Sequence, residues 1–211
     1  MHWPSYVTVS SNNTSVSYGH EANVLVFPSF FQTTNLSHKN LAPCLGFTKK
    51  GESVYAVPWS YEMLMQTEGT LVQKCKHCRD VAQGLLYLHE QGFCHGNLTI
   101  DKIVMANEPK ILDYLDPYRG QKRDWQDQTS TRKADIYDLG VLIYMCLHNN
   151  QKPPAKISNP QDDNLKFLYG IMKECLASNG IDRPSALDVV ETLDDTIQLL
   201  QQETGELVFY S

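Results

Sequence analysis

The chain has 211 residues, of which 42% are hydrophobic and 20% are charged, a composition typical of one soluble domain with a sizeable core. Its net charge is −6 and it has no long basic run, which argues against nucleic acid as the main partner. No apolar stretch is long enough to cross a bilayer, so we expect no membrane partner either.

The first part of the chain is predicted to be rich in β-strands. Short alternating or apolar runs predict strands at residues 6–10, 15–18, 23–27 and 54–58. Only the segment 29–37 remains for a helix in this part, and its apolar pattern is short and weak.

The remainder is predicted to be mainly helical. Apolar residues recur every three or four positions from Leu71 to Leu88, which predicts an amphipathic helix that ends at Gly92. Two short strands are predicted at 103–105 and 110–112, around a turn. A Pro-rich loop is predicted at 151–163, and further helices at 134–147, at 168–176 and after Ser185, which forms a capping-box pattern with Asp188.

The six cysteines fall mostly among apolar residues of predicted helices, as reduced core thiols do, and this favours a cytoplasmic location. Cys75-Lys-His-Cys78 has the spacing of half a zinc site. A structural zinc ion needs four ligands, and no second Cys/His pair with suitable spacing is visible. We therefore expect a packing role for both cysteines, and no metal or other cofactor.

The segment 93–105, FCHGNLTIDKIVM, carries the most informative pattern in the chain. It resembles the catalytic loop of protein kinases, His-Arg-Asp-Leu-Lys-Pro-x-Asn followed by a short apolar strand. His95 and Leu98 match this pattern. Gly96 stands at the Arg position, Asn97 at the catalytic Asp position, Thr99 at the Lys position and Lys102 at the metal-binding Asn position.

Five other passages resemble the same family, in the family's order. They are residues 38–47, 80–92, 110–115, 134–141 and 183–186. The resemblance implies an α+β fold, a bilobal protein-kinase-like fold with a reduced β-rich N-lobe and a mainly helical C-lobe that lacks a full activation segment. The expected boundaries are residues 1–60 for the N-lobe, 61–203 for the C-lobe and 204–211 for a C-terminal tail, which either docks on the domain or marks a cut from a longer protein.

The resemblance also implies structural roles for four residues. His95 and Tyr114 would stack in an apolar spine between the lobes, and Asp135 would hold the backbone of the catalytic loop. Arg183 normally pairs with a Glu at the end of the activation segment, but no matching Glu is visible here. An acid or base role for His95 is the alternative, and we favour the structural one.

The positions that depart from the family are those that carry its chemistry. Phosphoryl transfer needs phosphate positioning, metal ions and an oriented nucleophile. Phe27 occupies the expected place of the phosphate-positioning Lys, and no glycine-rich loop precedes it. Asn97 cannot accept a proton as Asp does, a loss typically worth about 10²–10⁴-fold in rate. A lone Asp113 is a poor magnesium site without a second ligand.

Lys102 has two interpretations. Its ammonium either reaches Asp113 and fills the metal position with an internal ion pair, or extends into solvent without a partner. A distance between the Lys102 amine and Asp113 decides between them.

We therefore expect a catalytically inactive pseudokinase that is not an enzyme, does not bind ATP, and serves as a scaffold or allosteric regulator of another protein. The alternative is an atypical or residual nucleotide-binding phosphotransferase that uses Asp113. A third hypothesis makes the chain one module of a larger protein. Four aromatic residues are candidate partner anchors or cleft-filling residues, namely Trp59, Tyr61, Tyr118 and Trp125.

Overall fold

A computed structural model describes residues 22–28, 36–47, 52–58, 62–63, 69–114 and 128–204. Several expectations lie outside these ranges: the strands at 6–10 and 15–18, most of the helix at 29–37, the four aromatic candidates Trp59, Tyr61, Tyr118 and Trp125, and the tail beyond residue 204. Leu36 and Ser37, which are described, are not helical.

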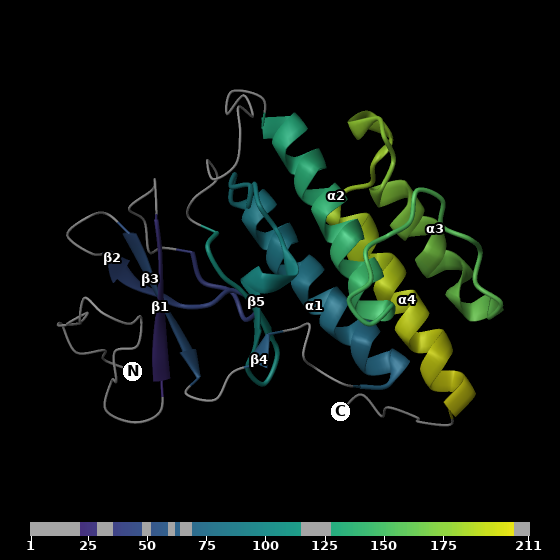
Figure 1. Cartoon of the computed structure of the whole chain (residues 1–211), viewed down its shortest axis with the longest axis horizontal. Helices are drawn as coiled ribbons and strands as arrows, with labels where there is room; N and C mark the ends of the chain where they lie inside the picture. Colours follow the sequence, from purple (N-terminus) through teal and green to yellow (C-terminus); the bar gives the residue numbers. More distant parts are fainter. Residues whose placement is uncertain are drawn as a thin grey trace.

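The first sheet is antiparallel and has the strand order β1-β3-β2 (Figure 1). Strands β1 (Ala22–Pro28) and β3 (Glu52–Pro58) confirm the two described strands that the sequence predicts, and β2 (Cys44–Phe47) completes the sheet. Phe27 lies in β1 opposite Ser53 of β3. The main chain at the expected phosphate-positioning residue is therefore in a strand, as the resemblance implies.

The second sheet has the order β4-β5-β6 and lies between the first sheet and the helices (Figure 1). Its strands are β4 (Glu62–Met63), β5 (Ile103–Met105) and β6 (Pro109–Ile111). Strand β6 begins and ends one residue earlier than the predicted range of 110–112. The reason is the turn that follows, since Asp113 has a φ of 59°, which takes the chain out of the extended conformation.

Helix α1 (Leu71–Glu90) begins and ends at well-defined caps. Thr70 Oγ1 accepts a hydrogen bond from the Gln73 backbone N–H, and the Gln73 side chain accepts one from the Thr70 N–H. At the other end, Gly92 has a φ of 83°, and the Phe93 N–H donates to the Leu88 carbonyl in a Schellman pattern. Gly92 therefore ends the helix, as predicted.

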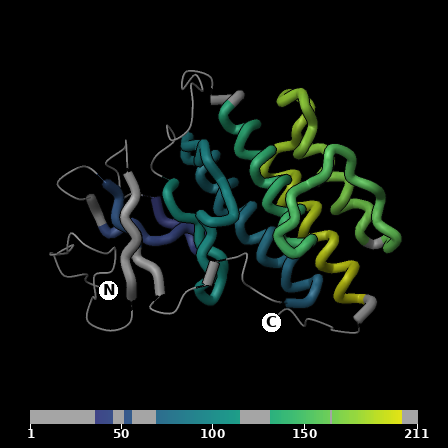
Figure 2. Tube along the Cα trace, viewed as in Figure 1, coloured from purple at the N-terminus to yellow at the C-terminus, as the bar shows by residue number. Residues whose placement is uncertain are grey.

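Three further helices complete the described part: α2 (Gln128–Leu147), α3 (Lys166–Cys175) and α4 (Ala186–Thr204). Short 3₁₀ turns lie at Ile100–Lys102, Asp163–Leu165 and Gly180–Asp182. Helix α1 runs beside α4, and α2 packs against both α1 and α3 (Figure 2). The predicted capping box at the start of α4 is present, because the side chains of Ser185 and Asp188 each accept the other's backbone N–H.

The core lies between these helices and the second sheet. Leu85, Ile103, Leu139 and Leu193 are all fully buried. Gly140 lets α2 approach α3, since a Cβ there would lie 2.6 Å from the Cβ of Cys175. No helix in the described part of the chain is long and apolar enough to span a membrane.

Candidate functional site

The loop after α1 is held by one carboxylate from α2. Asp135, which is fully buried, accepts hydrogen bonds from the backbone N–H of His95 at 2.8 Å and of Gly96 at 2.7 Å. Gly96 has a φ of 75°, a conformation that most other residues adopt only with strain. This contact to the loop backbone is the one that the resemblance implies for Asp135.

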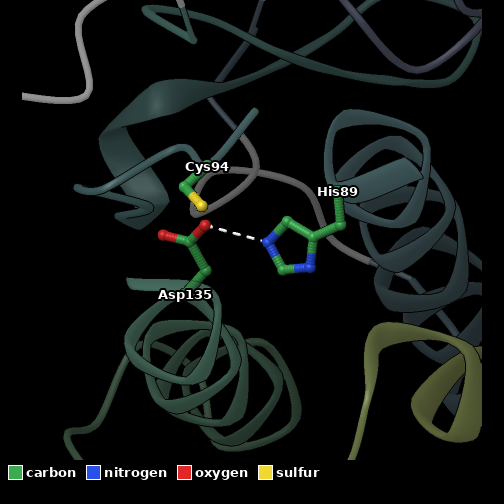
Figure 3. Close-up of side chains that lie close together, drawn as sticks. All are labelled: His89, Cys94 and Asp135. Carbon is green, nitrogen blue, oxygen red and sulfur yellow. Dashed lines mark hydrogen bonds and ion pairs between the residues drawn. The ribbon is translucent and has the colours of Figure 1, made fainter. Parts of the chain in front are cut away.

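His89, in the last turn of α1, contacts the same carboxylate (Figure 3). Its Nε2 atom lies 2.9 Å from Asp135 Oδ2. Because a carboxylate only accepts hydrogen bonds, Nε2 must carry the proton. The buried face of α1 thus supplies a polar group that helps to fix Asp135.

Cys94, His89 and Asp135 lie close together, and all three are residue types that can bind metal ions. They form the one such cluster among the described residues. The Cys94 thiol lies beside Asp135 in Figure 3, and burial raises the pKa of Cys94 to about 11. Both oxygens of Asp135 already accept backbone N–H groups, and a structural zinc site takes four ligands. The arrangement therefore suits hydrogen bonding better than metal binding.

His95 is buried beneath the loop and is hydrogen-bonded through both ring nitrogens. It is 1% exposed, and burial lowers its pKa, so the imidazole is neutral near pH 7. Its Nε2 lies 2.9 Å from the Leu112 carbonyl and must carry the proton there, which leaves Nδ1 to accept the Asn97 N–H at 3.3 Å. Both nitrogens are therefore engaged in the buried interior, and the structural role of His95 stays our prediction.

Lys102 and Asp113 form a buried ion pair. Lys102 Nζ lies 3.0 Å from Asp113 Oδ2, with side chains 11% and 3% exposed. The two residues face each other because they flank the β5–β6 hairpin, where the Leu112 N–H also donates to the Lys102 carbonyl at 2.8 Å. The prediction that the Lys102 amine reaches Asp113 is confirmed, and the solvent-exposed interpretation is wrong.

Tyr114 connects the second sheet to the first. Its hydroxyl donates to the Ala42 carbonyl at 2.7 Å, and its ring meets that of Tyr55 edge-on, with centroids 5.1 Å apart. Tyr55 comes from β3, and both rings are buried. Burial raises the pKa of the Tyr114 hydroxyl, so it stays a hydrogen-bond donor.

Arg183 finds its partners in the backbone and in an aromatic ring. Its guanidinium donates to the Ala177 carbonyl at 2.9 Å and to the Lys133 carbonyl at 2.8 Å. It also lies over the Tyr137 ring, 4.9 Å from the centroid. These contacts join the segment before α4 to α2, and they answer the question of its partner that the sequence left open.

The two cysteines that suggested zinc lie on the buried face of α1. Cys75 and Cys78 are fully buried, and neither belongs to the metal-type group around Asp135. None of the six cysteines of the chain forms a disulfide.

Sequence reasoning missed His89 and Cys94 as members of the site. His89 lies four positions after Leu85, on the apolar face of α1. A histidine on such a face needs a buried partner, so this spacing was an available signal. Cys94 offered none beyond its neighbour His95, because its position beside Asp135 depends on how α2 packs.

No protein-family profile matches the chain. Fibroblast growth factor receptor 1 of Dugesia japonica is 25% identical over 170 residues, which cover 65% of this chain and 20% of that protein. The calmodulin-binding receptor kinase CaMRLK of Arabidopsis thaliana is 26% identical over 123 residues, covering 57% and 17%. The mitogen-activated protein kinase kinase kinase dlk-1 of Caenorhabditis elegans is 23% identical over 193 residues, covering 72% and 21%.

These similarities support a place in the protein-kinase-like superfamily, and the helices and small sheets fit an α+β kinase-like fold. The chain spans about a fifth of the length of the curated relatives that it matches.

The comparisons correct one expectation. The sequence led us to expect a protein that is not an enzyme, but relatives such as CaMRLK and dlk-1 are named as kinases, which points to a phosphotransferase. The expectation rested on changes in both parts of the chain, at Phe27 and the absent glycine-rich loop and at Asn97 and Lys102. Such changes do not by themselves establish that a chain with kinase relatives is inactive.

Proposed function

We propose that this kinase-like domain acts as a regulatory module that binds a partner protein, as a scaffold or an allosteric regulator, and that it does not bind ATP with magnesium in the usual way. The observation that carries the proposal is the buried ion pair between Lys102 and Asp113. A two-lobed arrangement and a cytoplasmic location belong to the same proposal, and the absence of disulfides among the six cysteines supports the location.

The ion pair bears on nucleotide binding through its charge. Magnesium is bound by oxygen ligands, usually carboxylates and waters together with the phosphates of the substrate. Here the Asp113 carboxylate already has the Lys102 ammonium at 3.0 Å, and a second cation at that place would be repelled. The chain's own lysine thus takes the place that a metal ion would need.

Exposed apolar side chains support a binding role. Ile181 is 84% exposed and Phe167 is 67% exposed, on the segment before α4 and on α3. Single exposed apolar residues are common, but large ones are frequent anchors in protein interfaces. We therefore expect a partner to bind the surface formed by α3 and the segment before α4.

The second candidate function is a phosphotransferase that uses Asp113, because the relatives CaMRLK and dlk-1 are named as kinases. Asp113 remains at the metal-binding position of the resembled motif. In this function the Lys102 amine would have to leave Asp113 when nucleotide and metal arrive.

Thermal unfolding with ATP, in magnesium and in EDTA, separates the two functions. A ligand at about 100 times its Kd stabilises the native state by ~2.7 kcal/mol, which a melting curve detects readily. We expect no magnesium-dependent rise of the midpoint for the unaltered chain. A rise that needs magnesium and disappears in Asp113→Asn overturns the proposal and favours the phosphotransferase.

A gain-of-function variant sharpens this experiment. Lys102→Asn restores the residue type of the resembled motif, whereas Lys102→Met removes the charge without offering an oxygen. If Lys102 occupies the metal position, magnesium-dependent binding of ATP should appear in Lys102→Asn and stay absent in Lys102→Met. Lys156→Met, at an exposed lysine, is the matched control.

Partner binding is tested separately. Proteins that co-purify with the chain from cell extract should be depleted by Ile181→Ser or Phe167→Ser, and kept by Leu187→Ser, a less exposed apolar residue on α4. Equal recovery with all three variants would show that Ile181 and Phe167 do not belong to the partner-binding surface.

A further inference from the structure

Helix α3 presents an exposed face on the side of the helical part away from the two sheets (Figure 1). Phe167 is 67% exposed on this face, and the charged residues Lys166 and Glu174 are exposed as well. The exposed face therefore carries a cation and an apolar ring near its start and an anion near its end. The opposite face of α3 is buried in the core through four residues, Leu168, Ile171, Met172 and Cys175.

Gly170 lies in the middle of the exposed face, three positions after Phe167 and four before Glu174. Its φ is negative, so its backbone conformation does not require a glycine. A Cβ at Gly170 would meet no atom within 4 Å, and glycine inside a helix is destabilising relative to alanine. Packing within the described part of the chain thus gives no reason for Gly170, whereas the close approach of a second helix would require it.

We propose that the partner at α3 is a second copy of this chain, and that the two α3 helices pack antiparallel about a two-fold axis at Gly170. The contact is isologous, because the same surface serves both copies. This inference deepens the proposed function and rests on it, since the surface is the one that Phe167 marks for a partner protein.

The charges of α3 are self-complementary in the antiparallel arrangement. A two-fold axis at Gly170 places each residue beside the residue of the second copy that lies equally far on the other side of Gly170. Lys166 lies four positions before Gly170 and Glu174 lies four after it, so each Lys166 meets the Glu174 of the second copy. In a parallel pair the lysines would face each other, and so would the glutamates, which is unfavourable.

Lys166 already has a partner within its own chain, because its Nζ lies 2.8 Å from Asp163 Oδ1. The two side chains are 61% and 81% exposed, so this ion pair is weak. An ammonium has three donors, and the bond to Asp163 uses one of them. The Lys166 ammonium can therefore hold Asp163 and the Glu174 carboxylate of the second copy at the same time.

Phe167 supplies the apolar part of the contact. It lies three positions before Gly170, so the axis brings its ring to Lys173 of the second copy. The Lys173 amine donates to Asn159 Oδ1 at 2.5 Å within its own chain, and the methylenes of a lysine offer an apolar surface. Because Gly170 has no side chain, the ring can also lie against the helix backbone of the second copy.

The proposed interface is small. Helix α3 has 10 residues, which gives a length of about 15 Å. Interfaces that bury less than about 1,200 Å² are typical of weak and transient complexes. We therefore expect an equilibrium between monomer and dimer that depends on concentration.

Sedimentation equilibrium of the full chain, from about 5 to about 500 μM, tests the proposal. We expect the average mass to rise with concentration toward twice that of the monomer. Gly170→Gln should abolish this rise, because the new side chain fills the space at the axis. A monomer at every concentration, or a dimer that Gly170→Gln leaves intact, overturns the proposal.

The fold of the Gly170→Gln variant is checked by its thermal midpoint. The midpoint should be equal or higher, since nothing in the described chain crowds that position and glutamine is the better helix former. Glu191→Gln introduces the same side chain on the exposed face of α4 and is the matched control, which should leave the dimer unchanged.

Charge variants test the antiparallel arrangement. Lys166→Glu gives a helix face with two acids and Glu174→Lys gives one with two bases, so each variant alone should associate at least tenfold more weakly than the unaltered chain. Mixed in equal amounts, the two variants should form a heterodimer, because both cross-helix ion pairs are then present. A mixture that stays monomeric where the unaltered chain dimerises overturns the antiparallel pairing.

Failure of this inference is distinguishable from failure of the proposed function. Magnesium-dependent binding of ATP overturns the proposed function, whatever the mass of the chain. A monomeric chain whose co-purifying proteins are still depleted by Phe167→Ser overturns the second copy and supports a different protein at the same surface.

Discussion

Asp135 and Asp113 are both buried carboxylates near the same loop, but they are satisfied in opposite ways. Asp135 is 0% exposed and is held by two backbone N–H groups and His89. Asp113 is 3% exposed and is held by the ammonium of Lys102. The first carboxylate organises the backbone around it, and the second is one half of a charge pair. Their mutations should therefore behave differently.

The largest effect is expected at Asp135. Asp135→Ala leaves the N–H groups of His95 and Gly96 buried without their acceptor, so we expect a loss of about 3–5 kcal/mol in the free energy of unfolding. Urea denaturation measures it, with Asp195→Ala on the exposed face of α4 as the matched control. A loss no greater than that of the control would show that the loop does not depend on this carboxylate.

Breaking the Lys102–Asp113 ion pair should lower the free energy of unfolding somewhat less, and a second substitution should restore most of it. Lys102→Met leaves the Asp113 carboxylate without its cation, for about 2–4 kcal/mol. Replacing both charges, in Lys102→Met with Asp113→Asn, should recover most of that loss, because a buried pair often contributes little net stability. No second substitution should rescue Asp135→Ala in this way. Strictly additive losses in the double variant would contradict the contrast.

Arg183 combines features of the two carboxylates: like Asp135 it contacts neutral backbone groups, and like Asp113 it is a charge. Its substitution should have a smaller effect than either. Arg183→Lys keeps the charge but cannot reach both the Ala177 and Lys133 carbonyls with one fork, and it loses the planar contact with Tyr137. We expect a loss of about 1–2 kcal/mol by thermal unfolding. Lys166→Arg, at an exposed lysine, should have no comparable effect.

The pH dependence should be the smallest effect. Burial lowers the pKa of His95, so below its unfolded pKa of about 6.5 the unfolded chain takes up a proton that the native state excludes. The free energy of unfolding therefore falls as the pH falls, by at most about 1.4 kcal/mol per pH unit for one histidine. His38, His77 and His148 act in the same direction. Urea midpoints measured from about pH 7.5 to about pH 5.5 should decline, less steeply in His95→Asn. Stability that rises on acidification would contradict this.

The sequence predicted helices with strong periodicity well, and strand ends less well. Helix α1 has a clear apolar face and a glycine stop, whereas the end of β6 depends on the positive φ of Asp113, which no pattern marks. The capping box at Thr70 and Gln73 was readable from its spacing, but was not predicted.

Within the site, local patterns predicted contacts between neighbouring segments, whereas the expected distant contact, from Asp135 to the loop backbone, came from the family resemblance alone. The Lys102–Asp113 pair follows from a hairpin whose two arms are visible in the sequence. The contact between Asp135 and His89, and the partners of Arg183, depend on how α2 packs against α1 and on the turn before α4. Local patterns carry no information about that packing.

The β5–β6 hairpin also bears on the order of folding. Lys102 and Asp113 are brought together by a single tight turn, whereas Asp135 and the His95 N–H are 40 residues apart in the chain. Closing a longer loop costs more conformational entropy, so the hairpin and its ion pair can form before α2 docks. We therefore expect Lys102→Met to slow refolding and Asp135→Ala mainly to speed unfolding, which stopped-flow chevron plots would measure. The reverse pattern would mean that α2 docks first.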